Sequence, residues 1–198
     1  MKDLGEASYI FGMKIYRNRS RRLFVLSQSK YIDTILKRFN MKNFKKDYLL
    51  IGYGITLTKK DSPTIPQERE HMSGIPYASV VGSIMYVITC TRSNIVYSLD
   101  VVSRYQSNPD KNHWKIMKTI IKYLRNTKDQ WLIYGDTDLK LMGYTDSSFQ
   151  SDHDDSKSMS GYVFTLNGRV ICWKSFKQHT LVDSAYEVEY IAVSDAAK

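Results

Sequence analysis

The sequence predicts an α+β protein in two parts, residues 1–130 and residues 131–198. In the first part, two short strand-like segments precede stretches in which apolar residues recur with the period of an α-helix. After Asp129 the pattern changes to short apolar segments typical of strands, and Asn167-Gly168 is the strongest hairpin signal in the chain. We therefore expect a β-hairpin and helices first, and then a three-stranded antiparallel sheet with one helix.

The first part opens with expected strands at residues 8–16 and 23–26, joined by an arginine-rich hairpin loop. Ser27 or Ser29 can cap the helix that follows, because the next apolar residues keep helical spacing. Those residues are Ile32, Ile35, Leu36 and Phe39.

A polar segment, residues 42–74, separates this helix from the next ones. It contains prolines and paired lysines, so we expect a long surface connection rather than a helix or strand. Helical spacing of apolar residues then predicts helices at residues 77–89, 95–105 and 112–125.

The second part is expected to begin with strands at residues 131–134 and 139–146. Strands at 161–166 and 170–173 flank Asn167-Gly168, and a last helix begins near Ser184. We find no internal repeat in the sequence.

Composition limits the class of protein. The chain has 198 residues and carries a net charge of +9, and its hydrophobic fraction of 42% excludes a disordered tail. Its apolar stretches are too short for a transmembrane helix, and its charged N-terminus does not resemble a secretory signal. We therefore expect no membrane association and an intracellular location, in the cytoplasm or nucleus, with Cys90 and Cys172 as reduced thiols.

The charge is unevenly distributed along the chain. Residues 1–139 contain 23 Lys and Arg against 12 Asp and Glu, whereas residues 140–198 contain six against eight. The first segment therefore carries +11 and favours polyanionic partners, and the second carries −2.

Two groups of cations are candidates for nucleic-acid binding. Five of them recur every three or four residues on one stripe of an expected helix: Lys111, Lys115, Lys118, Lys122 and Arg125. The other four lie in the hairpin loop: Arg17, Arg19, Arg21 and Arg22. The alternative interpretations are an ordinary solvated helix face and an ordinary exposed hairpin.

Asp146 and Glu189 are the candidate catalytic and metal-binding residues. A carboxylate at a strand end and one on a helix that packs across the sheet can share Mg²⁺. Exposed acidic residues are common, so a solvated surface is the alternative. We expect Asp152, Asp154 and Asp155 to form a solvated loop, and the four isolated histidines give no support for zinc.

Motifs along nearly the whole chain carry a family resemblance. In the second part they are residues 143–149 (GYTDSSF), 154–164 (DDSKSMSGYVF), 173–175 (WKS) with 177–178 (KQ), and 183–184 (DS) with 187–192 (EVEYIA). In the first part they are residues 3–6 (DLGE) with Tyr9, Phe11 and Gly12, 26–28 (LSQ) with 30–31 (KY), 77–79 (YAS) with 82–83 (GS) and 85–86 (MY), 91–92 (TR), 113–114 (HW) and 122–124 (KYL). Together they resemble the Pol polyproteins of copia-type LTR retrotransposons.

This resemblance implies a reverse-transcriptase thumb or connection-like region at 1–130 and the N-terminal half of an RNase H-like domain at 131–198. Asp146 corresponds to the family's strand aspartate and Glu189 to its helix glutamate, with Glu187 as the less favoured alternative. The implied cofactor is Mg²⁺ or Mn²⁺, and the implied partner is an RNA–DNA hybrid or a primer–template.

The sequence also departs from the family pattern. No aspartate pair stands in the polymerase context Tyr-x-Asp-Asp, and the remaining RNase H carboxylates are expected beyond Lys198. We therefore expect a Pol fragment that binds nucleic acid and is inactive alone. It could associate with the remainder of Pol, or with itself through an open sheet edge. The alternatives are a non-catalytic, repurposed interaction protein and a decayed reading frame without a role.

Overall fold

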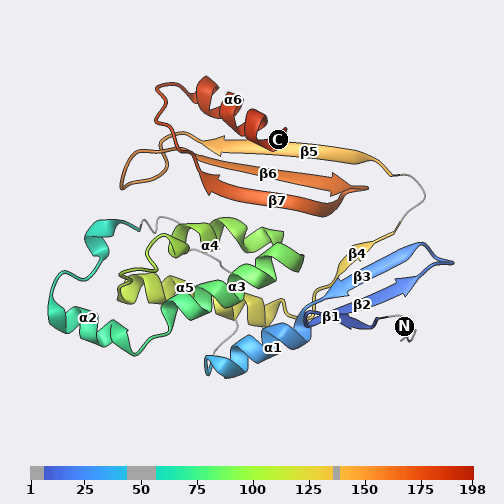
Figure 1. The fold of residues 1–198 in the computed structure, drawn as a ribbon, viewed down its shortest axis with the longest axis horizontal. Helices are drawn as coiled ribbons and strands as arrows, with labels where there is room; N and C mark the ends of the chain where they lie inside the picture. Colours follow the sequence, from blue (N-terminus) through green and yellow to red (C-terminus); the bar gives the residue numbers. More distant parts are fainter. Residues whose placement is uncertain (1–6, 44–56, 136–138) are drawn as a thin grey trace, which may run out of the picture.

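The computed structural model describes residues 7–43, 57–135 and 139–198, and shows two antiparallel sheets beside a layer of helices (Figure 1). The first segments are β1 (Tyr9–Ile10), β2 (Met13–Asn18), β3 (Leu23–Ser27), α1 (Ser29–Arg38), α2 (Pro66–Ser73), α3 (Tyr77–Thr91), α4 (Val96–Ser103) and α5 (Lys111–Asn126). They are followed by β4 (Leu132–Tyr134), β5 (Leu141–Ser148), β6 (Met159–Leu166), β7 (Arg169–Lys177) and α6 (Ala185–Ala196). This arrangement confirms the α+β class.

The first sheet has the strand order β1-β2-β3-β4. The single strand expected at residues 8–16 is instead two strands, because the chain turns at Phe11 and Gly12. Both residues have positive φ angles, 49° and 80°, and glycine adopts this conformation at little cost. The pairing of Tyr9 with Lys14 then closes a short hairpin.

β4 belongs to the first sheet. The sequence groups residues 131–134 with the second part, but Leu132, Ile133 and Tyr134 pair with Leu26, Val25 and Phe24 of β3. Sequence pattern identifies a strand without identifying its partner, so this long-range pairing was not foreseen. The division of the chain at residue 130 stays a prediction.

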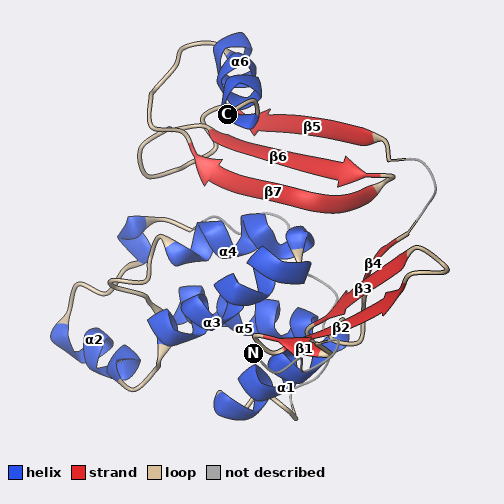
Figure 2. Ribbon diagram, turned by 45° about the vertical axis from the view of Figure 1, so that its right-hand side comes forward, coloured by secondary structure: helices blue, strands red, loops and turns tan. Residues whose placement is uncertain are grey.

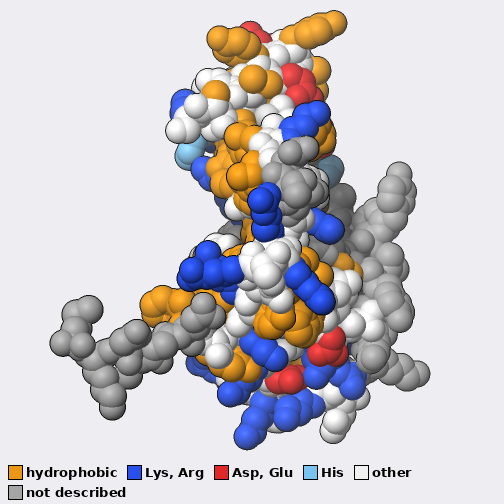
Figure 3. Space-filling model, turned by 90° about the vertical axis from the view of Figure 1, so that its right-hand side faces the viewer, with side chains coloured by type: hydrophobic (Ala, Val, Ile, Leu, Met, Phe, Trp, Pro, Cys, Tyr) orange, Lys and Arg blue, Asp and Glu red, His pale blue; other side chains and the backbone are white. Residues whose placement is uncertain are grey.

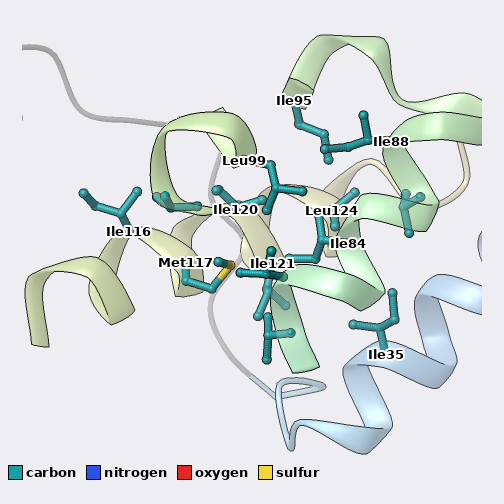
Figure 4. Close-up of a cluster of buried hydrophobic side chains, with 14 of the residues drawn as sticks. Ile35, Ile84, Ile88, Ile95, Leu99, Ile116, Met117, Ile120, Ile121 and Leu124 are labelled. Carbon is teal, nitrogen blue, oxygen red and sulfur yellow. The ribbon is translucent and has the colours of Figure 1, made fainter. Parts of the chain in front are cut away.

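The helical layer contains one continuous apolar core (Figure 4). Ile121, Met117 and Leu124 of α5 pack against α3 and α4, while Ile35 of α1 approaches from below in that view. The buried residues of α5 follow helical spacing, which confirms the sequence prediction for this helix. α1 begins after Gln28, whose side chain makes no capping bond, so neither expected serine caps it.

The connection expected at residues 42–74 contains regular structure in its described portion. A single 3₁₀ turn lies at Lys59–Asp61, and α2 begins at Pro66. Proline fits the first position of a helix because it has no backbone N–H to leave unpaired there. Residues 44–56 lie outside the described residues.

The second sheet has the strand order β5-β6-β7. Asn167 and Gly168, with φ angles of 51° and 71°, form the tight turn between β6 and β7, as the sequence predicts. Ser184 caps α6 by accepting a hydrogen bond from the Glu187 N–H (3.3 Å). The sheet lies between α6 on one side and the helical layer on the other (Figures 1 and 2).

Within the described ranges, no single helix is long and apolar enough to cross a membrane. Taken together, α2 and α3 would have the length and apolar composition of a membrane span, but a bend of 50° separates them.

Candidate functional site

The cations of α5 lie opposite its buried face. Lys111 and Lys115 are exposed, while Lys118, Lys122 and Arg125 are half-buried. The buried side of the helix consists of His113, Ile116, Met117, Ile120, Ile121 and Leu124. Lys118 Nζ also lies 6.0 Å from the centre of the Trp114 ring. The stripe predicted from the sequence is therefore a basic helix face that a ligand can reach.

The arginine loop is a defined turn between β2 and β3. Asn18 Oδ1 accepts hydrogen bonds from Ser20 Oγ (2.8 Å) and from the Arg21 backbone N–H (3.0 Å). These bonds fix the backbone of the turn, which carries the exposed Arg19, Arg21 and Arg22. Arg17, expected in the loop, is also exposed but lies in β2, where it pairs with Phe24 of β3. Lys and Arg side chains are prominent on the middle and lower parts of the face shown in Figure 3.

Asp146 lies inside β5, two residues before the strand ends. It pairs with Gly161, and the next residue on the same face, Ser148, pairs with Met159. Met159 Sδ accepts a hydrogen bond from Arg104 Nη2 (2.7 Å), just after α4. Since residues opposite each other in adjacent strands share a face, Asp146 lies on the face toward the helical layer.

Glu189 lies with α6 on the opposite side of the sheet. Gln178 Nε2 donates to Ser160 Oγ (2.7 Å) and to the Val188 carbonyl of α6 (3.1 Å). Ser160 pairs with Ser147, which alternates with Asp146, so α6 packs on the other face. Glu187 and Glu189 are both exposed on this helix.

The described residues therefore do not form a shared metal site. The side chain of Asp146 lies on one face of the second sheet, whereas α6, which carries Glu189, packs on the other face. The described part of the chain contains no group of three or more His, Cys, Asp or Glu side chains that could hold a metal ion. Joint metal binding by these two carboxylates stays a prediction.

A cavity of about 320 Å³ separates this face of the sheet from α4. Its walls include Val96 and Tyr97 of α4, and Tyr144, Asp146 and Val163 of the sheet. A neighbouring cavity of about 480 Å³ lies between α3, α4 and β7. The sheet and the helical layer are thus incompletely packed against each other.

The acidic loop that joins β5 to β6 is not a solvated loop, which corrects the expectation from sequence. Asp152 is only 6% exposed, and its Oδ2 lies 2.5 Å from Arg104 Nη1 and 3.1 Å from Lys177 Nζ. Asp155 also pairs with Lys177 (2.9 Å). Because Arg104 follows α4 while Lys177 ends β7, Asp152 links the helical layer to the second sheet. We call Arg104, Asp152 and Lys177 the ionic link.

The environment of Asp152 stabilises its charged form. Burial by itself raises the pKa of this carboxyl group, but the hydrogen bonds from Asp154 N–H and Lys177 outweigh that effect. Together with the positive charges of Lys177 and Arg104, they lower the pKa of Asp152 to about 2.

Sequence reasoning missed Tyr97, Tyr144, Arg104 and Lys177. Tyr97 and Tyr144 are far apart in the chain, as are Arg104 and Lys177, and only the docking of the sheet on α4 brings them to one interface. Their positions in the sequence follow no helix or strand period that would predict that they lie close together. The only signal in the sequence was the density of aspartates between β5 and β6.

Comparison with known proteins gives several relatives. The chain is 46% identical over its whole length to a retrovirus-related Pol polyprotein from transposon TNT 1-94 of Nicotiana tabacum. It is 31% identical, again over its whole length, to the corresponding polyprotein from transposon RE1 of Arabidopsis thaliana. The chain spans only 15% and 13% of the lengths of these two polyproteins.

A third relative is shorter. A protein named secreted RxLR effector protein 161, from Plasmopara viticola, is 38% identical over 128 residues. That match covers 64% of this chain and 90% of the effector. No family model matches the chain, and no solved structure matches it.

Proposed function

Because the chain belongs to the retrovirus-related Pol polyproteins of copia-type retrotransposons, we propose that it is a nucleic-acid-binding segment of Pol. Its first part is the C-terminal part of a reverse transcriptase, and its second part is the N-terminal half of an RNase H-like domain. The ligand is an RNA–DNA hybrid or a primer–template, met in the cytoplasm or nucleus.

The basic face of α5 is the observation that carries this proposal. Five cations at successive turns lie on the side of the helix opposite the apolar core. Like charges at this spacing repel one another and destabilise a helix unless a polyanion neutralises them. A phosphate backbone follows such a stripe, and each neutralised phosphate releases counterions.

The hairpin arginines support the same ligand. Their side chains extend from a turn that the Asn18 hydrogen bonds hold in one conformation. Arginine offers planar, multiple N–H donors to phosphate oxygens, and these contacts carry no sequence information. Recognition is therefore of backbone charge and of the A-like shape of a hybrid, rather than of base sequence.

The test is fluorescence anisotropy with a labelled RNA–DNA hybrid over a series of salt concentrations. We expect binding that weakens steeply with salt. In Lys115→Gln/Lys122→Gln the slope of log affinity against log salt should decrease by about two, because two phosphate contacts are lost. Lys59→Gln/Lys60→Gln removes the same charge from the exposed 3₁₀ turn and is the matched control.

Equal loss of affinity in both double variants would attribute binding to net charge and contradict a specific role for α5. Absence of binding by a folded wild-type chain would contradict the proposed function itself.

Asp146 and Glu189 are proposed as the counterparts of two carboxylates of a Mg²⁺-dependent RNase H. Mg²⁺ supplies activation of water and stabilisation of the leaving oxygen in phosphodiester hydrolysis when it is bound. Since the described residues do not bring these carboxylates together, we derive no catalytic step from them.

A second candidate function is a non-catalytic interaction protein. The relative from Plasmopara viticola supports it, because 90% of that separately named protein matches this chain. A segment related to this one therefore makes up most of a protein that is not named as a Pol polyprotein. A chain that folds, fails to bind the hybrid and forms a stable oligomer unaffected by Asp146→Asn would favour this candidate.

A further inference from the structure

The cavity between α4 and the second sheet has walls from both parts of the molecule. α4 contributes Val96 and Tyr97, while β5 contributes Tyr144 and Asp146. The two tyrosines are 51% and 55% exposed, so their rings border open space instead of packing into a core. The volume of about 320 Å³ is within the range of small-ligand sites.

The charge in this cavity is negative and unpaired. Among the described residues, Asp146 has neither a hydrogen-bond nor an ion-pair partner. The lining also includes Lys174, but its Nζ lies 4.7 Å from the centre of the Phe176 ring. Lys174 pairs with Tyr162, which in turn pairs with Thr145, so Lys174 lies on the face opposite Asp146 and its charge does not neutralise this carboxylate.

We propose that this cavity binds an organic ammonium group, such as a quaternary or methylated amine. Tyrosine ring faces attract a cation, a free carboxylate complements its charge, and apolar walls accommodate its methyl groups. Val96, Met159 and Val163 supply those apolar walls. The inference goes beyond nucleic-acid binding and does not depend on it.

Other ligand classes fit less well. A phosphate would be repelled by Asp146. Mg²⁺ needs near-octahedral oxygen coordination and gives up its water reluctantly, and Asp146 is the single carboxylate in this lining, whose other side-chain oxygens are hydroxyls. An uncharged apolar molecule would gain no electrostatic attraction from the carboxylate of Asp146, which is exposed on β5. An organic ammonium group satisfies both the aromatic and the charged portions of the lining.

The ionic link determines whether the cavity exists. Asp152 does not line it, yet its bonds to Arg104 and Lys177 hold the sheet over α4. Tyr97 and Tyr144 stay on opposite walls of one cavity only while this docking persists. Loss of Asp152 should therefore weaken ammonium binding without removing a ligand contact.

The experiment is an NMR titration of the full chain with tetramethylammonium chloride, following the ring resonances of Tyr97 and Tyr144. We expect saturable shifts of both, and weaker binding by about threefold to fivefold in Asp146→Asn and in Tyr97→Leu. Asp152→Asn should weaken binding at least as much, while Asp195→Asn, which breaks an exposed pair with Lys198, should leave it unchanged. If Asp152→Asn fails to fold, Lys177→Gln replaces it.

Two further ligands distinguish the alternatives. Dimethylbutanol, a neutral molecule of similar shape to choline, should bind more weakly than choline, and MgCl₂ at matched ionic strength should not displace tetramethylammonium. Tighter binding of choline would indicate a free ammonium compound as the ligand, and tighter binding of trimethyllysine amide would indicate a methylated lysine side chain. Absence of saturable shifts, equal binding of the neutral isostere, or displacement by Mg²⁺ would each overturn the proposal.

Discussion

The helical layer and the second sheet bury apolar surface to very different extents. α1, α3, α4 and α5 share one continuous core in which Ile84, Ile120 and Ile121 are fully buried. In the described residues after 138, the buried apolar side chains are Met159, Val188 and Ala192, while several large ones on β5 and α6 stay exposed. The sheet is held on the helices by the ionic link and bordered by cavities. We therefore expect the helical layer to be the more stable region, and the position of the second sheet to depend on the ionic link.

The largest effect should follow from a truncation in the helical core. Ile121→Ala removes a side chain that is inaccessible to solvent, and should lower the free energy of unfolding by about 3–4 kcal/mol. Urea unfolding followed by circular dichroism measures this loss. The control is Met85→Ala, on the exposed side of α3, where a change below about 0.5 kcal/mol is expected. Equal losses in the two variants would show that this layer is not a well-packed core.

The next effect concerns the ionic link and pH. The pKa of Asp152 is lowered from its ordinary value of 3.8 to about 2, so its contribution to stability is complete above pH 4. That contribution disappears as pH falls through 2, and amounts to at most about 2.5 kcal/mol. Acid titration of the second sheet, followed by the NMR signals of β6, should show this transition. Asp152→Asn should abolish it and Asp195→Asn should not; an unchanged acid transition in Asp152→Asn would disprove the link.

A smaller effect is expected at the contact of α6 with the sheet. Val188→Ala removes two methyl groups from a fully buried position and should cost about 1–2 kcal/mol. Because this position is outside the helical core, hydrogen exchange should rise in α6 and β5 while α5 stays protected. Increased exchange in α5 to the same extent would mean that the two regions unfold as one unit.

No effect is expected from Asp146→Asn on cleavage of an RNA–DNA hybrid in the presence of Mn²⁺. The strand register places this carboxylate on the face opposite α6, away from a shared metal with Glu189. An end-labelled hybrid incubated with wild type and variant should remain uncut by both. Cleavage by wild type alone would show that the carboxylates converge in another arrangement of the sheet and α6.

Several features could be predicted from sequence because they depend on neighbouring residues. The helical spacing in α5 predicts both its buried face and its basic stripe, and the structure has the buried face on the expected side. Asn167-Gly168 predicts a turn because both residues adopt positive φ angles more readily than most. Local pattern also locates Ser184 at the start of α6. In each case the information lies within a few residues of the feature.

Other features could not be predicted because they depend on contacts between distant segments. Residues 132–134 are recognisable as a strand, but only the folded chain pairs them with β3. Asp152 has the sequence context of a surface loop, yet Arg104 and Lys177 reach it and allow a buried charge. The face on which Asp146 lies depends on the strand register and on which side α6 packs. The sequence by itself determined the helices other than α2, the turn between β6 and β7, the charge distribution and the family. The tertiary structure alone decided which strands pair, which carboxylate is buried and which residues share a cavity, because these follow from long-range packing.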